Sequence, residues 1–167
     1  NNNLIITIGR EYGTGGREIG QKLALRLGVP FYDRELITRA AKKTGFDEKL
    51  FEQLDKRATN SFLYSLTMFG SVGLNGMSLT DQLYLAQSNI IREMAEDSSC
   101  VIVGRCADHV LRDFPNKFDF FIHGSIEDRV KRVQTCGDYV IEGKTPEAAL
   151  EKMDKQRSTS VSYTHLT

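Results

Sequence analysis

Residues 13 to 16 read Gly-Thr-Gly-Gly, a composition typical of loops that bind phosphate. Glycine conformations let consecutive backbone N–H groups converge on an anion, and the start of a helix adds partial positive charge. The apolar run from Leu4 to Ile8 precedes these glycines, and a helical pattern follows them. This order of strand, loop and helix is where α/β sheets gather ligands. We predict that Gly13, Thr14, Gly15, Gly16 and Arg17 bind the phosphates of ATP; a tight turn without a ligand is the alternative.

The loop lacks the lysine of the standard motif, G-x-x-x-x-G-K-[ST]. If Gly15 is the second glycine of that motif, the first falls on Arg10, the lysine on Gly16 and the hydroxyl residue on Arg17. Arg10 and Arg17 flank the glycines, and a guanidinium group binds phosphate oxygens through paired N–H donors. We predict that Arg17, on the first turn of the helix, takes the catalytic part of the lysine.

No magnesium ligand stands out in the sequence. Magnesium that accompanies a nucleotide keeps several waters and takes few ligands from the protein. Without a hydroxyl at the standard position, three residues are alternatives and none is favoured: Thr14, Glu18 and Asp108.

Four short apolar runs have the length and composition of strands, and longer helical patterns separate them. The first and third are almost continuously apolar, as expected for parallel strands with helices on both faces. We therefore predict a three-layer α/β fold of the P-loop NTPase type, with the first strand between the third and the fourth. The runs are Leu4–Ile8, Val29–Tyr32, Cys100–Val103 and Phe118–Ile122.

Four helices are predicted from apolar spacing and from capping residues. Apolar residues recur every four positions after the glycine loop, and Gly28 ends that helix. The other three begin with residues typical of helix starts. Their first residues are Ser78-Leu79-Thr80-Asp81, Ser125-Ile126-Glu127-Asp128 and Thr145-Pro146-Glu147.

The length of 167 residues fits a single domain, 1–167. We expect a core formed by 4–57 and 79–135, a flap-like insertion at 58–78 and a lid region at 136–157. The insertion lies in a stretch without charge, Ala58 to Thr80, in which polar residues interrupt the apolar ones. It is interpreted as a loop and short helix packed on the domain, with a mobile flap or a homodimer surface as alternatives.

The charge balance and the cysteine content limit which binding partners and which cellular compartment we expect. The chain has 22 basic and 22 acidic residues, so no overall positive charge points to nucleic acid or an acidic membrane. Three cysteines, Cys100, Cys106 and Cys136, have no metal-binding spacing and fit a reducing compartment. No signal pattern is visible at the N-terminus. We expect a cytoplasmic protein whose partners are small-molecule nucleotides, with no nucleic acid and no membrane.

Three stretches together resemble the cytidylate kinase-like family of P-loop nucleoside monophosphate kinases. ITIGREYGTGGREIG is similar to that family's variant loop, in which Gly-Gly-Arg replaces the lysine. VPFYDRELITRAA places Asp33 and Arg39 six residues apart, as at the start of the monophosphate-binding region. VIVGRCADHVL resembles the segment after the third strand, with Arg105 as the matching arginine.

The resemblance implies ATP-dependent phosphorylation of a nucleoside monophosphate, CMP or dCMP, with Mg²⁺. Arg39 and Arg105 would each follow a strand and bind the acceptor's phosphate; a solvated surface arginine is the alternative for each. The monophosphate site would also include Asp33 and Asp108.

For the lid, the resemblance and the spacing suggest Arg129, Arg132 and Arg157, with Arg132 also catalytic. Arg129 and Arg132 lie three apart and share a helix face. The alternative is an exposed helix with a surface pair between Asp128 and Arg132. His109 and His123 are interpreted as structural.

Two departures from the family pattern occur near these positions. Cys106 stands where the related kinases have aspartate, and only Asp154 matches their R-D-x-x-D-x-x-R helix. We also expect the last strand of such kinases, which would follow Arg157, to be missing from this chain. The altered helix and the missing lysine favour a second hypothesis, a nucleotide-binding protein with little or no kinase activity.

Overall fold

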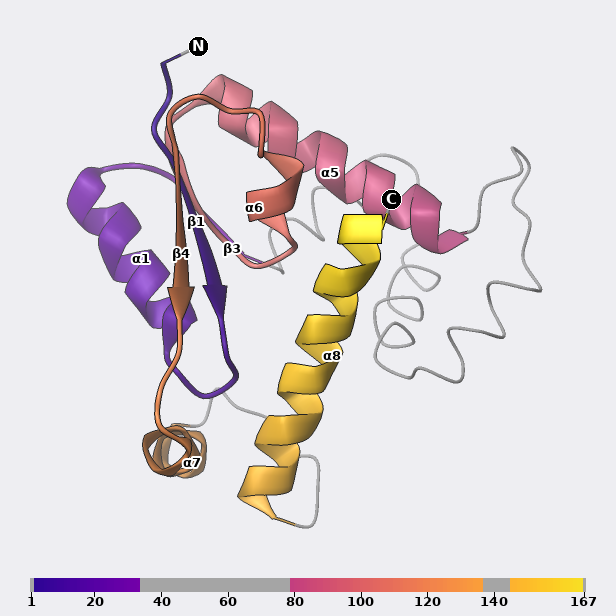
Figure 1. Cartoon of the computed structure of the whole chain (residues 1–167). Helices are drawn as coiled ribbons and strands as arrows, with labels where there is room; N and C mark the ends of the chain where they lie inside the picture. Colours follow the sequence, from indigo (N-terminus) through magenta and orange to yellow (C-terminus); the bar gives the residue numbers. More distant parts are fainter. Residues whose placement is uncertain (1, 34–78, 137–144, 167) are drawn as a thin grey trace.

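The computed structural model describes residues 2–33, 79–136 and 145–166 (Figure 1). Arg39, the insertion at 58–78 and residues 137–144 of the predicted lid region lie outside these ranges. In chain order the elements are β1 (Ile5–Arg10), α1 (Gly16–Leu27), β2 (Phe31–Tyr32), α5 (Leu79–Asp97), β3 (Cys100–Val103), α6 (Ala107–Val110), β4 (Lys117–Ile122), α7 (Ile126–Thr135) and α8 (Pro146–Leu166).

The four strands form one parallel sheet in the order β2-β3-β1-β4. The predicted central place of β1 is confirmed, because it pairs with β3 on one side and β4 on the other. Ile5 is opposite Cys100 and Lys117, so the strands are in register from their first residues. Their carboxyl ends therefore meet at the edge where the glycine loop begins.

The alternating side chains of β1 and β3 form two cores, one on each face of the sheet. Ile6, Ile8 and Val103 pack with Ala24 of α1 on one face. On the opposite face the core includes Ile5 and Ile102 of the sheet, Ile91 of α5 and Leu111 after α6. Figure 1 shows α1 on one side of the strands and α5 and α6 on the other. The predicted three-layer α/β arrangement is confirmed.

The predicted helix boundaries are confirmed where the sequence carried caps. Gly28 has a φ of 65°, and its N–H group bonds back to the carbonyls of α1. At the start of α7, the Ser125 side chain accepts a bond from the Asp128 N–H group. Thr145 accepts one from Ala148 N–H at 3.2 Å and so caps α8.

The structure differs from the sequence interpretation after β3. The short helix α6 was not predicted. It follows a left-handed turn at Arg105 and Cys106, and because neither residue is glycine, the sequence does not indicate a turn there. The helix α8 continues to Leu166, beyond the predicted end of the lid at 157. Within the described ranges no strand follows β4, which forms an edge of the sheet and exposes about half or more of Phe118, Phe120 and Phe121.

No helix in the described part of the chain is both long and apolar enough to cross a bilayer.

Candidate functional site

The glycine loop turns the chain from β1 into α1 through two residues with left-handed backbone conformation. Gly13 has a φ of 82° and Gly15 a φ of 73°, where side chains with a Cβ are strained. The Gly15 carbonyl accepts the Ile19 N–H group at 3.0 Å and so begins the helical bonding. The loop thus presents the N-terminus of a helix of 12 residues, the end that favours a phosphate anion.

An ionic cluster around one buried arginine anchors the base of the loop. Arg129 of α7 is only 6% exposed, and its Nε donates to the Tyr12 carbonyl at 2.8 Å. Its guanidinium also contacts Glu11 at 3.3 Å and bonds to Asp154 of α8. Asp154 in turn accepts the Tyr12 N–H group at 2.7 Å. Arg129 therefore supports the loop from beneath, and Asp154 attaches α8 to the same point.

Arg132 of α7 lies directly against the loop. A Cβ atom placed on Gly15 would stand 2.7 Å from Arg132 Cζ and 2.8 Å from Nη2. The guanidinium bonds to Glu18 on the first turn of α1, and Lys22 bonds to the same carboxylate at 2.6 Å. Lys22 first, and Arg132 second, lower the pKa of Glu18 below its usual value. The Asp128 carboxylate accepts a bond from the Ser125 hydroxyl at 2.8 Å.

Arg157 reaches the end of β1 from α8. Its Nη1 donates to the Arg10 carbonyl at 3.1 Å, and its guanidinium carbon lies 5.2 Å from the centre of the Tyr12 ring. The three arginines that the sequence assigned to the lid, Arg129, Arg132 and Arg157, thus all contact residues 10 to 18.

The chain after β3 makes a left-handed turn at the same edge of the sheet. Gly104, Arg105 and Cys106 have φ angles of 82°, 59° and 52° in succession. The Gly104 N–H group bonds to the Ile8 carbonyl at 3.1 Å, which ties this turn to β1. Arg105 Nη1 donates to Gln87 Oε1 on α5 at 3.5 Å. Arg105 is therefore positioned one strand away from the glycine loop.

Gln87 is a candidate site residue that the sequence analysis did not identify. Its side chain is 7% exposed, and its Nε2 has no hydrogen-bond partner among the described residues. A buried amide nitrogen without a partner costs free energy and marks a place where a ligand oxygen or a water fits. A glutamine on a helix with apolar neighbours gives no signal of this kind in a single sequence.

Arg17 and Asp33, assigned by sequence to opposite substrates, form an ion pair. Arg17 Nε donates to Asp33 Oδ2 at 2.7 Å, and Asp33 is only 5% exposed. The Arg17 side chain is half-exposed and is directed to the end of β2. Asp108, in contrast, is exposed on α6, where its backbone carbonyl accepts Lys117 Nζ at 2.9 Å.

The three alternatives for magnesium do not assemble into a preformed site. The Thr14 hydroxyl donates to the Glu11 carbonyl at 2.9 Å, and Glu18 is occupied by two cations. Among the described residues no group of three acidic, histidine or cysteine side chains could hold a metal ion. These residues fit a magnesium ion held mainly by nucleotide phosphates and water.

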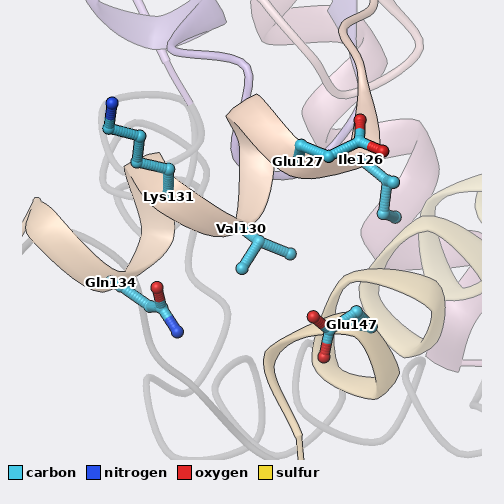
Figure 2. A pocket seen from close by; sticks show the side chains of 6 residues that line it. All are labelled: Ile126, Glu127, Val130, Lys131, Gln134 and Glu147. Carbon is cyan, nitrogen blue, oxygen red and sulfur yellow. The ribbon is translucent and has the colours of Figure 1, made fainter.

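A shallow pocket of about 460 Å³ lies between α7 and α8. Figure 2 shows Val130 of α7 and Glu147 at the start of α8 on opposite sides of it. None of the site residues predicted from the sequence lines this pocket, so it is separate from the loop. Its lining residues are Ile126, Glu127, Val130, Lys131, Gln134 and Glu147.

The comparisons with known proteins agree with this geometry. A model of the cytidylate kinase-like family matches residues 5–166. The chain belongs to the cytidylate kinase-like family. Membership in this family supports phosphotransferase activity on a P-loop type of fold. No curated protein sequence matches the chain.

Two solved structures are similar to this member of the cytidylate kinase-like family. An uncharacterized protein from Eubacterium ventriosum ATCC 27560 is 30% identical, with a TM-score of 0.63, over 98% of this chain and 77% of that one. A shikimate kinase from Acinetobacter baumannii, solved with shikimate, is 15% identical with a TM-score of 0.52, over 97% of this chain and 80% of that one. The second likeness concerns the fold alone.

Proposed function

We propose that this protein transfers the γ-phosphoryl group of ATP to a nucleoside monophosphate, with CMP or dCMP as the preferred acceptor. The observation that supports this most is the placement of arginines at the ends of two adjacent strands. Arg132 lies against Gly15 in the loop after β1, and Arg105 follows β3, the neighbour of β1. Phosphoryl transfer needs two substrates held in line with cations around the moving group, and little covalent work from the protein.

In this proposal the donor and the acceptor occupy neighbouring ends of the sheet. The glycine loop and Arg17 bind the phosphates of ATP, and Arg132 exchanges Glu18 for a phosphate oxygen when ATP arrives. Arg105 binds the acceptor's phosphate with Arg39, and Asp33 and Asp108 complete the monophosphate side. Magnesium, when bound with ATP, would neutralise phosphate charge. Arg129 and Arg157 act through the loop that they contact.

The experiment that tests the proposal is a coupled assay of ADP formation with each nucleoside monophosphate in turn. We expect CMP or dCMP to raise the rate of ADP formation well above the rate without an acceptor. If no monophosphate raises that rate, the kinase assignment is wrong.

A second candidate function is a nucleotide-binding protein with little or no kinase activity. The observation that favours it is that both Arg17 and Arg132 are engaged by carboxylates, Asp33 and Glu18. ATP binding by calorimetry, together with the coupled assay, separates the two candidates. Tight ATP binding without acceptor-dependent ADP formation would favour the second.

A further inference from the structure

Two departures from the standard phosphate loop, at positions 10 and 16, are linked in space. Arg10 replaces the first glycine of the motif, and Gly16 replaces the lysine. A Cβ atom placed on Gly16 would stand 2.8 Å from Arg10 Cβ, 3.0 Å from Cγ and 3.5 Å from Cδ. The stem of Arg10 therefore crosses the point at which a lysine side chain would leave the backbone. The two side chains exclude each other.

The other end of the Arg10 side chain lies over the acceptor side of the site. A Cβ atom on Gly104 would overlap Arg10 Nη1 and stand 3.2 Å from Cζ. Gly104 follows β3 directly and precedes Arg105. Arg10 is half-buried, and its side chain lies against both Gly16, the first residue of α1, and Gly104, in the turn that carries Arg105.

We propose that Arg10 is the catalytic cation that replaces the lysine and contacts the phosphoryl group in transfer. This inference rests on the proposed kinase function. An oxygen of the acceptor's phosphate forms a bond to the γ-phosphorus, and the bond from that phosphorus to the bridging oxygen of ATP breaks. The electron pair of the broken bond stays on the leaving ADP. The Arg10 guanidinium donates N–H bonds to the oxygens on which charge builds up, and no proton leaves it.

The placement of Arg17 supports this assignment to Arg10. Arg17 Nε is held by the buried Asp33 at the end of β2, and β3 lies between β2 and β1. Arg10, by contrast, crosses from the loop to β3 itself. The position of Arg17 in the sequence favoured it as the catalytic arginine. A sequence does not show in which direction a side chain extends.

Charge at position 10 is tested with Arg10→Met, Arg10→Lys and, as a control, Arg112→Ala, an exposed arginine away from the loop. Methionine keeps an unbranched stem over Gly16 but removes the charge. We expect Arg10→Met to lower kcat by on the order of a hundredfold or more, Arg10→Lys to retain part of the activity, and the control to match wild type. A kcat of Arg10→Met within about twofold of wild type would overturn the proposal.

The exclusion between positions 10 and 16 is tested with Arg10→Gly, Gly16→Lys and the double variant. Each single change should lower kcat by about a hundredfold, the first by loss of the cation and the second by a clash. The double variant restores the standard pattern at both positions, and we expect it to exceed each single variant by at least about tenfold. A double variant no faster than the slower single one would show that the side chains share no space.

Measurements of nucleotide binding can test the role of Arg10 even if the proposed kinase activity is wrong. If wild type transfers phosphate to no monophosphate, the kinase proposal fails, and calorimetry then judges Arg10. We expect Arg10→Met to weaken ATP binding about tenfold and AMP binding little, because in this proposal the guanidinium contacts the γ-phosphoryl group, which AMP lacks. Equal ATP affinity in both proteins would overturn the role of Arg10.

Discussion

At the scale of single residues, backbone conformation and side-chain placement combine to build the site. Gly15 holds a left-handed conformation beneath Arg132, so any side chain there is both strained and in contact with a guanidinium group. Gly104 combines a positive φ with the Arg10 contact in the same way. The backbone conformation and the neighbouring arginine both favour glycine at these two positions. Substitutions there are expected to reduce ligand binding more than they reduce folding.

Gly15→Val should weaken ATP binding by at least about a hundredfold, because valine is strained at a φ of 73° and displaces Arg132. Calorimetric titration with ATP measures the effect, and far-UV circular dichroism should show an unchanged fold. The matched control is Gly28→Val, at a φ of 65° with open space around its Cβ position. Equal loss of ATP affinity in the two variants would show that strain alone, and not the loop, is responsible.

Arg105→Ala should weaken use of the monophosphate roughly ten- to a hundredfold, because a charge-assisted bond from arginine to phosphate is lost. ATP affinity should barely change. Steady-state kinetics with the acceptor varied, and calorimetry with ATP, measure the two effects. If ATP affinity fell as far as acceptor use, Arg105 would belong to the donor side.

At the scale of elements, α7 and α8 are attached to the glycine loop through one buried arginine. Arg129 bonds to the Tyr12 carbonyl and to Asp154, so movement of either helix changes the base of the loop. Arg132, three residues further along α7, lies against Gly15 of the loop. One helix therefore supplies two arginines to the same loop: Arg129 as a buried support, and Arg132 as the proposed phosphate ligand.

Arg129→Met should lower the free energy of unfolding by about 3 kcal/mol, since it leaves Asp154 and the Tyr12 carbonyl without their buried partner. Urea denaturation measures the change. Arg132→Met is the matched control on the same helix, and its effect should be far smaller because Glu18 is exposed. Similar losses in both variants would contradict the structural role of Arg129.

At the scale of the whole molecule, stability at high pH reports on the core between the sheet and α5. Cys100 is 1% exposed, and burial raises the pKa of its thiol from 9.0 to about 11. The folded protein then holds a proton that the unfolded chain releases, so folding stability falls as pH rises from about 9 to about 11. The loss is at most about 1.4 kcal/mol per pH unit.

Urea denaturation of wild type and Cys100→Ala across this pH range tests the prediction. The wild-type advantage over the alanine variant should shrink as pH rises, because only wild type carries the buried thiol. A difference between the two proteins that stays constant up to pH 11 would contradict it.

The features that the sequence predicted correctly depend on local patterns of residues. The features that it did not predict depend on contacts between residues far apart in the chain. Apolar runs and caps located the strands and helices, and β3 has the predicted bounds of Cys100–Val103. The placement of Arg10 over Gly104 joins residues far apart in the chain, and nothing near either position indicates it. Arg129 was expected on a lid face. It is instead buried and paired with Glu11 of the loop and Asp154 of α8, two partners that are distant in the sequence. The roles of Arg39 and of residues 58–78 stay predictions outside the described residues.

The fate of the γ-phosphate tests the central claim most directly. The protein is incubated with ATP labelled at the γ-phosphorus and with CMP, and the labelled products are separated by chromatography. The kinase account predicts that the label appears in CDP and that Arg105→Ala and Arg10→Met slow its appearance. Label that remains in ATP, or appears only as inorganic phosphate, with CMP and every other nucleoside monophosphate would contradict it.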